Sequence, residues 1–175
     1  MPQPAHPKAP RPRPSLASPA VGADTLPAYA ELHCRSNFSF LVGASHPQEL
    51  VARAAQLGYA AIAITDECSV AGVVRAHEEA KRQAEGGSPL KLIIGSEFTL
   101  DGEGSAAGCR LVLLAHDREG YGNLCELITQ ARLRSEKGHY RATTRDVDAG
   151  ALAGMPHCSA LLIPRRDDPP QTLLA

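Results

Sequence analysis

Ionisable side chains accompany four apolar segments of this 175-residue chain. The residues, in chain order, are His33, Asp66 with Glu67, Glu97 and His116. Imidazole nitrogens and carboxylate oxygens ligate divalent cations, and the same groups transfer protons in acid–base catalysis. If the four segments are parallel strands, their carboxyl ends lie at the same edge of one sheet. The pattern therefore predicts that these side chains converge on one rim.

The elements that would position these residues alternate between strand and helix. Strands are expected over 29–33, 60–65, 90–94, 110–115 and 160–163, and helices over 46–57, 70–85, 120–134 and 146–152. Ser45 is the expected N-cap of the first helix, with Gln48 three residues later. Repeated strand–helix units with short connections predict a parallel sheet with right-handed crossovers. Residues 101–108 are expected to form a loop or hairpin tip.

Composition sets the domain boundaries and limits the class of protein. Eight of the fourteen prolines lie in residues 1–27, which predicts a disordered leader before a domain at 28–164 and a disordered tail at 165–175. The net charge of −1 gives no global basic field for nucleic acid. Five scattered cysteines fit a reducing cytosol, and no apolar run is long enough to span a bilayer. We therefore expect a cytoplasmic protein without a membrane partner.

Three stretches resemble a known family. They are ELHCRSNFSFLVGASHPQELVARAAQLGYAAIAITDECSVAGVVRAHEEAKR, LIIGSEFTL and RLVLLAHDREGYGNLCELITQAR. They are similar to the N-terminal polymerase-and-histidinol-phosphatase (PHP) domain of bacterial C-family DNA polymerases, most closely of the error-prone branch. The resemblance implies an α/β fold, a distorted seven-fold β/α barrel, of which this chain would supply the first four to five units. It also implies a metal site at the carboxyl rim, which in related enzymes hydrolyses phosphoesters and in some replicative polymerases trims DNA 3′ ends.

The resemblance assigns roles to individual residues. His33 matches the first histidine of a His-x-His motif, and Arg35 stands in place of the second. Asp66 matches the aspartate of a Thr-Asp-His motif, with Glu67 in place of the histidine. Glu97 matches the glutamate that closes the third strand. His33, Asp66, Glu67 and Glu97 are therefore the candidate metal ligands.

Arg35 is expected to block this site. A guanidinium cannot ligate a metal, and it repels a cation about 4 Å away by about 4 kcal/mol at an effective dielectric constant near 20. Arg35 is expected to pair with Glu67 or Asp66 and to leave a degenerate site with little or no hydrolysis. Glu67 could still bind a metal, so residual Zn²⁺ or Mn²⁺ is the one cofactor considered for this chain.

Structural interpretations of the same residues stay open. His33 could be a core or turn histidine, Asp66 a helix cap, and Glu97 a salt-bridge partner. His116 is assigned to an exposed loop. Lys137, Tyr140 and Arg141 form a small basic loop that could touch nucleic acid, although a solvated surface is the simpler interpretation.

The sequence thus predicts the PHP-domain portion of an error-prone DNA polymerase used in damage-induced mutagenesis and translesion synthesis. No catalytic residue is expected in this chain, because the carboxylates that hold two Mg²⁺ ions in such polymerases lie downstream. DNA would be bound through the full-length protein, and mutagenesis accessory proteins are possible partners. The alternatives are a stand-alone metal-dependent PHP phosphoesterase and a non-catalytic interaction module.

Overall fold

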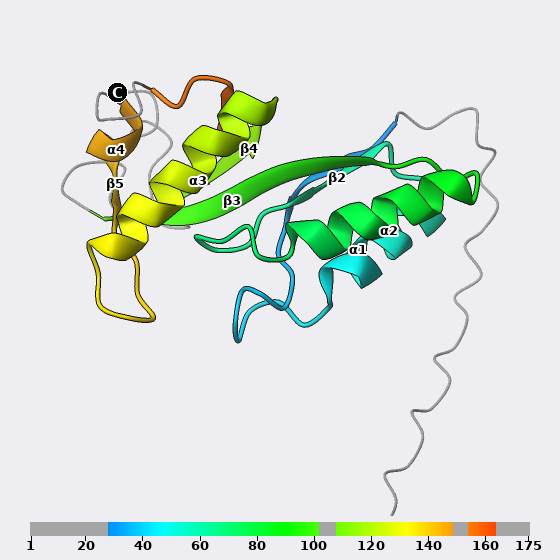
Figure 1. The fold of residues 1–175 in the computed structure, drawn as a ribbon, viewed down its shortest axis with the longest axis horizontal. Helices are drawn as coiled ribbons and strands as arrows, with labels where there is room; N and C mark the ends of the chain where they lie inside the picture. Colours follow the sequence, from blue (N-terminus) through cyan, green and yellow to red (C-terminus); the bar gives the residue numbers. More distant parts are fainter. Residues whose placement is uncertain (1–27, 102–107, 149–153, 164–175) are drawn as a thin grey trace, which may run out of the picture.

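A curled sheet with helices packed against it forms the fold of the chain (Figure 1). The computed structural model describes residues 28–101, 108–148 and 154–163. The strands are β1 (Ala30–Cys34), β2 (Ala61–Ile64), β3 (Lys91–Asp101), β4 (Arg110–Ala115), β5 (Ala142–Thr143) and β6 (Cys158–Ile163). The helices are α1 (Pro47–Gln56), α2 (Val73–Glu85), α3 (Arg118–Leu133) and α4 (Thr144–Asp148). The expected α/β partial-barrel class is confirmed, whereas the predicted leader, the tail and residues 102–107 lie outside the described residues.

Only part of the sheet is parallel. The strand order is β1-β2-β3-β4-β6, with β5 paired to β3. β1, β2 and the first half of β3 run parallel, but β4 is antiparallel to both β3 and β6. The expectation of a wholly parallel sheet is therefore wrong for the pairs β3–β4 and β4–β6, because β4 runs against its two neighbours. Eight residues separate the end of β3 from the start of β4, whereas a parallel pair would need a crossover of a dozen or more residues.

β3 is long because it changes its partner along its length. Ile94 pairs with Ile64 of β2, and the next residue, Gly95, pairs with Leu114 of β4. A β-carbon on Gly95 would lie 2.6 Å from the carbonyl oxygen of Leu113, so only glycine fits where β4 joins. Glu97 consequently lies inside β3, and the expectation that it closes the third strand is wrong.

Two groups of buried apolar residues hold the helices on the sheet. α1 and α2 lie side by side and cover one end of β3, and α3 lies along its other end (Figure 1). Ile62 and Ile64 of β2 face α1 and α2, whereas Ala63 between them faces the opposite side of the sheet. β2 is buried throughout, as its uninterrupted apolar sequence predicts.

The helix boundaries differ from those that the apolar pattern predicts. α1 begins after His46, whose backbone N–H donates to the Glu49 carboxylate, so the predicted Ser45–Gln48 cap is wrong. α2 begins at Val73 instead of residue 70. α4 spans Thr144–Asp148 instead of starting at Asp146, and the rest of that predicted helix lies outside the described residues. None of the helices in the described part is long and apolar enough to cross a membrane.

Candidate functional site

The buried carboxylate of Glu97 is the centre of a charged cluster. Glu97 is fully buried. The guanidinium of Arg35 binds both of its oxygens, with an Nε–Oε2 distance of 3.2 Å, and its NH2 group donates to Oε1. The Nε2 atom of His33 contacts the same Oε2 oxygen. β1 and the turn after it carry His33 and Arg35, and β3 carries Glu97, so the parallel strands bring them together.

A second arginine contacts Glu97 from β4. The NH1 atom of Arg110 lies 3.7 Å from Oε2 of Glu97. Arg110 pairs with Thr99 in the antiparallel ladder, which places it close to Glu97 along β3. Sequence reasoning missed Arg110, because its position depends on the hairpin. We call His33, Arg35, Glu67, Glu97 and Arg110 the Glu97 cluster.

The surroundings of His33 lower the pKa of its imidazole. Burial lowers its pKa most, and the charges of Arg35 and Arg110 lower it further. A carboxylate only accepts hydrogen bonds, so the contact with Glu97 requires a proton on Nε2 of His33. His33 therefore donates to Glu97, and Arg35 supplies the main compensating charge.

Asp66 is buried beside this cluster but has different partners. Its Oδ1 accepts from the Ser36 N–H at 2.7 Å and from the Ser39 hydroxyl at 2.8 Å, and its Oδ2 accepts from the Ser36 hydroxyl at 2.7 Å. Asp66 is 1% exposed. The N-cap of α2 is Gly72, without a side-chain cap. Asp66 therefore orders the turn after β1 and does not cap the helix.

Glu67 lies at the edge of the cluster and is held by a tyrosine. Its Oε1 accepts from the hydroxyl of Tyr140 at 2.8 Å, and that hydroxyl accepts from the Thr99 N–H at 2.8 Å. Burial raises the pKa of Tyr140 to about 12, so the phenol stays protonated and donates. Arg35 is 3.9 Å from Glu67. The expected Arg35–Glu67 contact is thus present, but the main partner of Arg35 is Glu97. Asp66 is not among the ion-pair partners of Arg35 in the described residues.

Of the three loop residues suggested for nucleic-acid contact, Tyr140 alone reaches a member of the Glu97 cluster. Tyr140 points inward to Glu67, Arg141 pairs with Asp101 at 3.5 Å, and Lys137 is exposed. Nucleic-acid contact by this loop stays a prediction.

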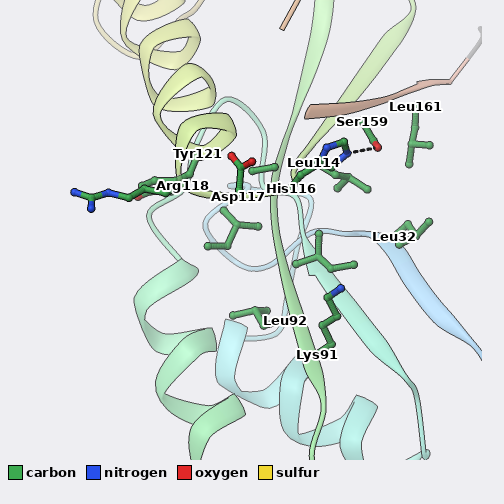
Figure 2. Close-up of a pocket in the computed structure, with 13 residues that line it drawn as sticks. Leu32, Lys91, Leu92, Leu114, His116, Asp117, Arg118, Tyr121, Ser159 and Leu161 are labelled. Atoms are coloured by element: carbon green, nitrogen blue, oxygen red, sulfur yellow. Dashed lines mark hydrogen bonds between the residues drawn. The ribbon is translucent and has the colours of Figure 1, made fainter. Parts of the chain in front are cut away.

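His116 lines a separate pocket of about 710 Å³, where it lies close to Ser159, and Lys91 and Leu92 line another part of the same pocket (Figure 2). Its Nε2 atom is 2.6 Å from the Ser159 hydroxyl, and its exposed position agrees with the loop assignment. Because β4 runs antiparallel to β3, the expected convergence of His116 with His33 on one rim is wrong.

Metal-binding capacity depends on how the carboxylates and imidazoles are grouped. Within the described ranges, no three His, Cys, Asp or Glu side chains are grouped as metal ligands. The oxygens of Asp66 and Glu97 instead accept hydrogen bonds from serine, arginine and histidine. The arrangement is a buried ion-pair network that joins β1, β3 and β4.

Fold and sequence together define the class of this protein. Residues 31–159 match the PHP domain family, and the chain belongs to that family. It is 61% identical over 155 residues to the error-prone DNA polymerase of Ralstonia nicotianae, covering 86% of this chain and 14% of that protein. It is 60% identical over 144 residues to the error-prone DNA polymerase of Bordetella parapertussis, covering 79% and 13%. The chain thus spans about a seventh of the length of these relatives.

Among solved structures, an amidohydrolase from Chromobacterium violaceum is similar over 61% of this chain and 34% of its own. The sequence identity is 26% and the TM-score is 0.48.

Proposed function

We propose that this chain is the N-terminal PHP portion of a bacterial error-prone DNA polymerase, acting in damage-induced mutagenesis and translesion synthesis in the cytoplasm. The identity of 61% over 155 residues to a protein of that name supports the proposal. DNA would then be bound by the full-length polymerase, and polymerase chemistry would lie outside these residues. Accessory proteins of mutagenesis would be partners of the whole protein.

Within this proposal the PHP site is degenerate. The observation that carries it is the Arg35 guanidinium bound to both oxygens of the buried Glu97. A cation at that carboxylate would lie beside the charges of Arg35 and Arg110, and neither side chain can ligate it. The residues present therefore do not fit a divalent metal, and the ion pairs take over the task of neutralising Glu97. The domain is then a brace for the polymerase rather than a hydrolase.

A stand-alone phosphoesterase is the less favoured alternative. Such an enzyme needs several neutral imidazoles and carboxylates around closely spaced cations. Here Asp66 is saturated by Ser36 and Ser39, and Glu97 by Arg35 and His33. The third alternative, a non-catalytic interaction module, differs from our proposal only in whether the gene continues.

The intact mass of the product in cells tests the polymerase assignment. An antibody against residues 49–56 of α1 would detect the native protein in a lysate. A species much larger than 18.5 kDa supports the proposal, and a single species at 18.5 kDa contradicts it.

Metal analysis tests the degenerate site. The chain is incubated with Zn²⁺ or Mn²⁺, desalted, and assayed for bound metal and for cleavage of single-stranded DNA 3′ ends. We expect neither. Arg35→His restores an imidazole at that position and serves as the control that reports metal binding by the same assay. Stoichiometric metal and 3′-end cleavage in the unsubstituted chain would contradict a degenerate site.

A further inference from the structure

Three consecutive large apolar side chains project from the turn between β1 and α1. Phe40 is 83% exposed, Leu41 is 106% exposed and Val42 is 60% exposed. We call these three residues the apolar tip. Exposed apolar side chains that stand singly are normal on a protein surface, whereas three together mark an interaction site.

A rigid base carries the apolar tip. Ser36 and Ser39 are buried, and both donate their hydroxyl hydrogens to Asp66. The N–H groups of Val42 and Gly43 donate to the Ser39 carbonyl at 3.1 and 3.0 Å. A β-carbon on Gly43 would overlap the Ser36 carbonyl, so the turn closes tightly on itself. The tip is therefore held in one conformation, and little entropy is lost when it binds.

The backbone at the tip is strained. Leu41 has φ = 65°, in the left-handed region that leucine disfavours by roughly 1–2 kcal/mol. Asparagine or glycine would adopt this conformation more easily. A leucine at this position gains nothing from its own fold, because its side chain contacts solvent. Its presence is explained if the side chain is buried against a partner.

The surroundings of the tip determine the kind of partner. From Ser36 to Leu50 the sequence holds no lysine or arginine, so the segment itself supplies no cation for phosphates or an anionic membrane. Arg75 lies over the ring of Phe38, with its Cζ atom 5.8 Å from the ring centroid. A hollow of about 500 Å³ lies beside Phe40 and is lined by apolar Phe38 and Ala71 and by the charged residues Glu67 and Arg132, among others. An apolar projection beside a hollow that holds both a carboxylate and a guanidinium matches the mixed surface of another polypeptide, with the pairing of projection and pocket found at protein interfaces.

We propose that the apolar tip docks into an apolar pocket on the polypeptide that makes up the rest of the longer polymerase. This inference rests on the proposed function. The rest of the polymerase is the partner because this chain spans only about a seventh of the length of the relatives it matches. A domain joined to so much further chain has an intramolecular partner at high effective concentration. Asp66 then acts as a positioning residue, since its carboxylate orders the turn that presents Leu41.

The test compares the tip in the 175-residue chain and in a longer protein. In the longer protein, residues 28–163 of this chain replace the matching segment of the Ralstonia nicotianae relative. Hydroxyl-radical footprinting with mass spectrometry measures side-chain accessibility directly. We expect oxidation of Phe40 and Leu41 to be several-fold slower in the longer protein, while Leu57 on the far end of α1 is unchanged. Equal oxidation of Leu41 in both proteins overturns the proposal.

A substitution gives a second, independent measurement. Leu41→Asn relieves the backbone strain, so it does not lower the Tm of the 175-residue chain, whereas it lowers the Tm of the longer protein by a few degrees. Leu57→Asn is the matched control and changes both proteins alike. The same shift for Leu41→Asn in both overturns the proposal. So does Leu41-dependent sedimentation of the 175-residue chain with phosphatidylglycerol vesicles, or Leu41-dependent binding of a single-stranded oligonucleotide.

Primer extension separates this proposal from the one on which it rests. A longer protein that extends a primer but leaves Leu41 exposed contradicts only the docking surface. A longer protein that does not fold with this segment in place contradicts the proposed function, and the docking surface with it.

Discussion

Arg35 binds the fully buried carboxylate of Glu97 through two of its nitrogens, and this pair joins the turn after β1 to the middle of β3. A buried ion pair is weak evidence of stability compared with an apolar pair, but removing one partner leaves an uncompensated charge. Among the described residues, Glu97 would keep the contact with His33 and the more distant charge of Arg110. Loss of Arg35 should therefore destabilise the fold more than loss of an arginine from an exposed ion pair.

Arg35→Ala is expected to destabilise the domain by about 3 kcal/mol, because the Glu97 carboxylate loses its main counter-charge. Urea unfolding followed by circular dichroism measures the change. Arg141→Ala is the matched control: its pair with Asp101 is exposed, and its loss should cost less than about 1 kcal/mol. Equal effects of the two substitutions would show that the buried pair has no special role.

Tyr140→Phe removes the hydroxyl that bridges Glu67 and the Thr99 N–H. The expected cost is about 1–3 kcal/mol, because a half-buried acceptor and a backbone donor both lose their partner. Thermal unfolding of the variant beside the parent chain measures it. An unchanged Tm would mean that water replaces the hydroxyl without loss.

Two glycines give opposite expectations for the same added methyl group. Gly43→Ala should destabilise strongly, because the β-carbon would overlap the Ser36 carbonyl and force the turn apart. Gly122 lies inside α3 with no atom near its would-be β-carbon, so Gly122→Ala should stabilise by roughly 0.5–1 kcal/mol. Urea midpoints of both variants measure this. Opposite signs support the close packing of the turn, and two stabilising substitutions would contradict it.

His157 should make the domain more stable in mild acid. Hydrogen bonding to Asp117 raises the pKa of His157 most, and the Asp117 charge adds to it. A raised pKa in the folded state means that the stabilisation is complete below pH 6.5 and is lost as the pH rises through the folded value. His157→Asn, which tolerates the positive φ at this position, should remove this part of the pH dependence. Tm measured from pH 5 to 9 decides whether it does.

His33 should have the opposite effect. Its pKa is lowered mainly by burial, so the folded state resists protonation at this site. Stability is then complete above pH 6.5 and is lost as the pH falls through the lowered folded value. In His33→Gln the loss between pH 6.5 and 5 should become smaller. If the loss of stability between pH 6.5 and 5 is the same in the variant, the pKa of His33 does not differ between the folded and the unfolded state.

The sequence predicts the elements of this fold better than their directions. β2 and α2 follow from apolar patterns that have one physical interpretation each. The apolar segment Leu111–Leu114 is equally suited to a parallel or an antiparallel buried strand, so nothing in it shows that β4 turns back along β3. That single reversal moves His116 away from the cluster and brings Arg110 into it. That Arg35 pairs with a carboxylate was predictable from its chemistry. The choice of Glu97 over Asp66 depends on how Ser36 and Ser39 occupy Asp66.

The change of partner along β3 also has a consequence for the order of folding. Its second half pairs with β4 across a short connection, so this hairpin closes at a small loop entropy. The first half of β3 pairs with β2, and α2 lies between these two strands in the sequence. This pairing joins residues farther apart in the sequence, so it is expected to form more slowly. We expect the β3–β4 hairpin with α3 to form the nucleus, and β1 and β2 to join a strand that is already half built. The Glu97 cluster, which needs β1, β3 and β4 together, would then be among the last parts of the domain to form.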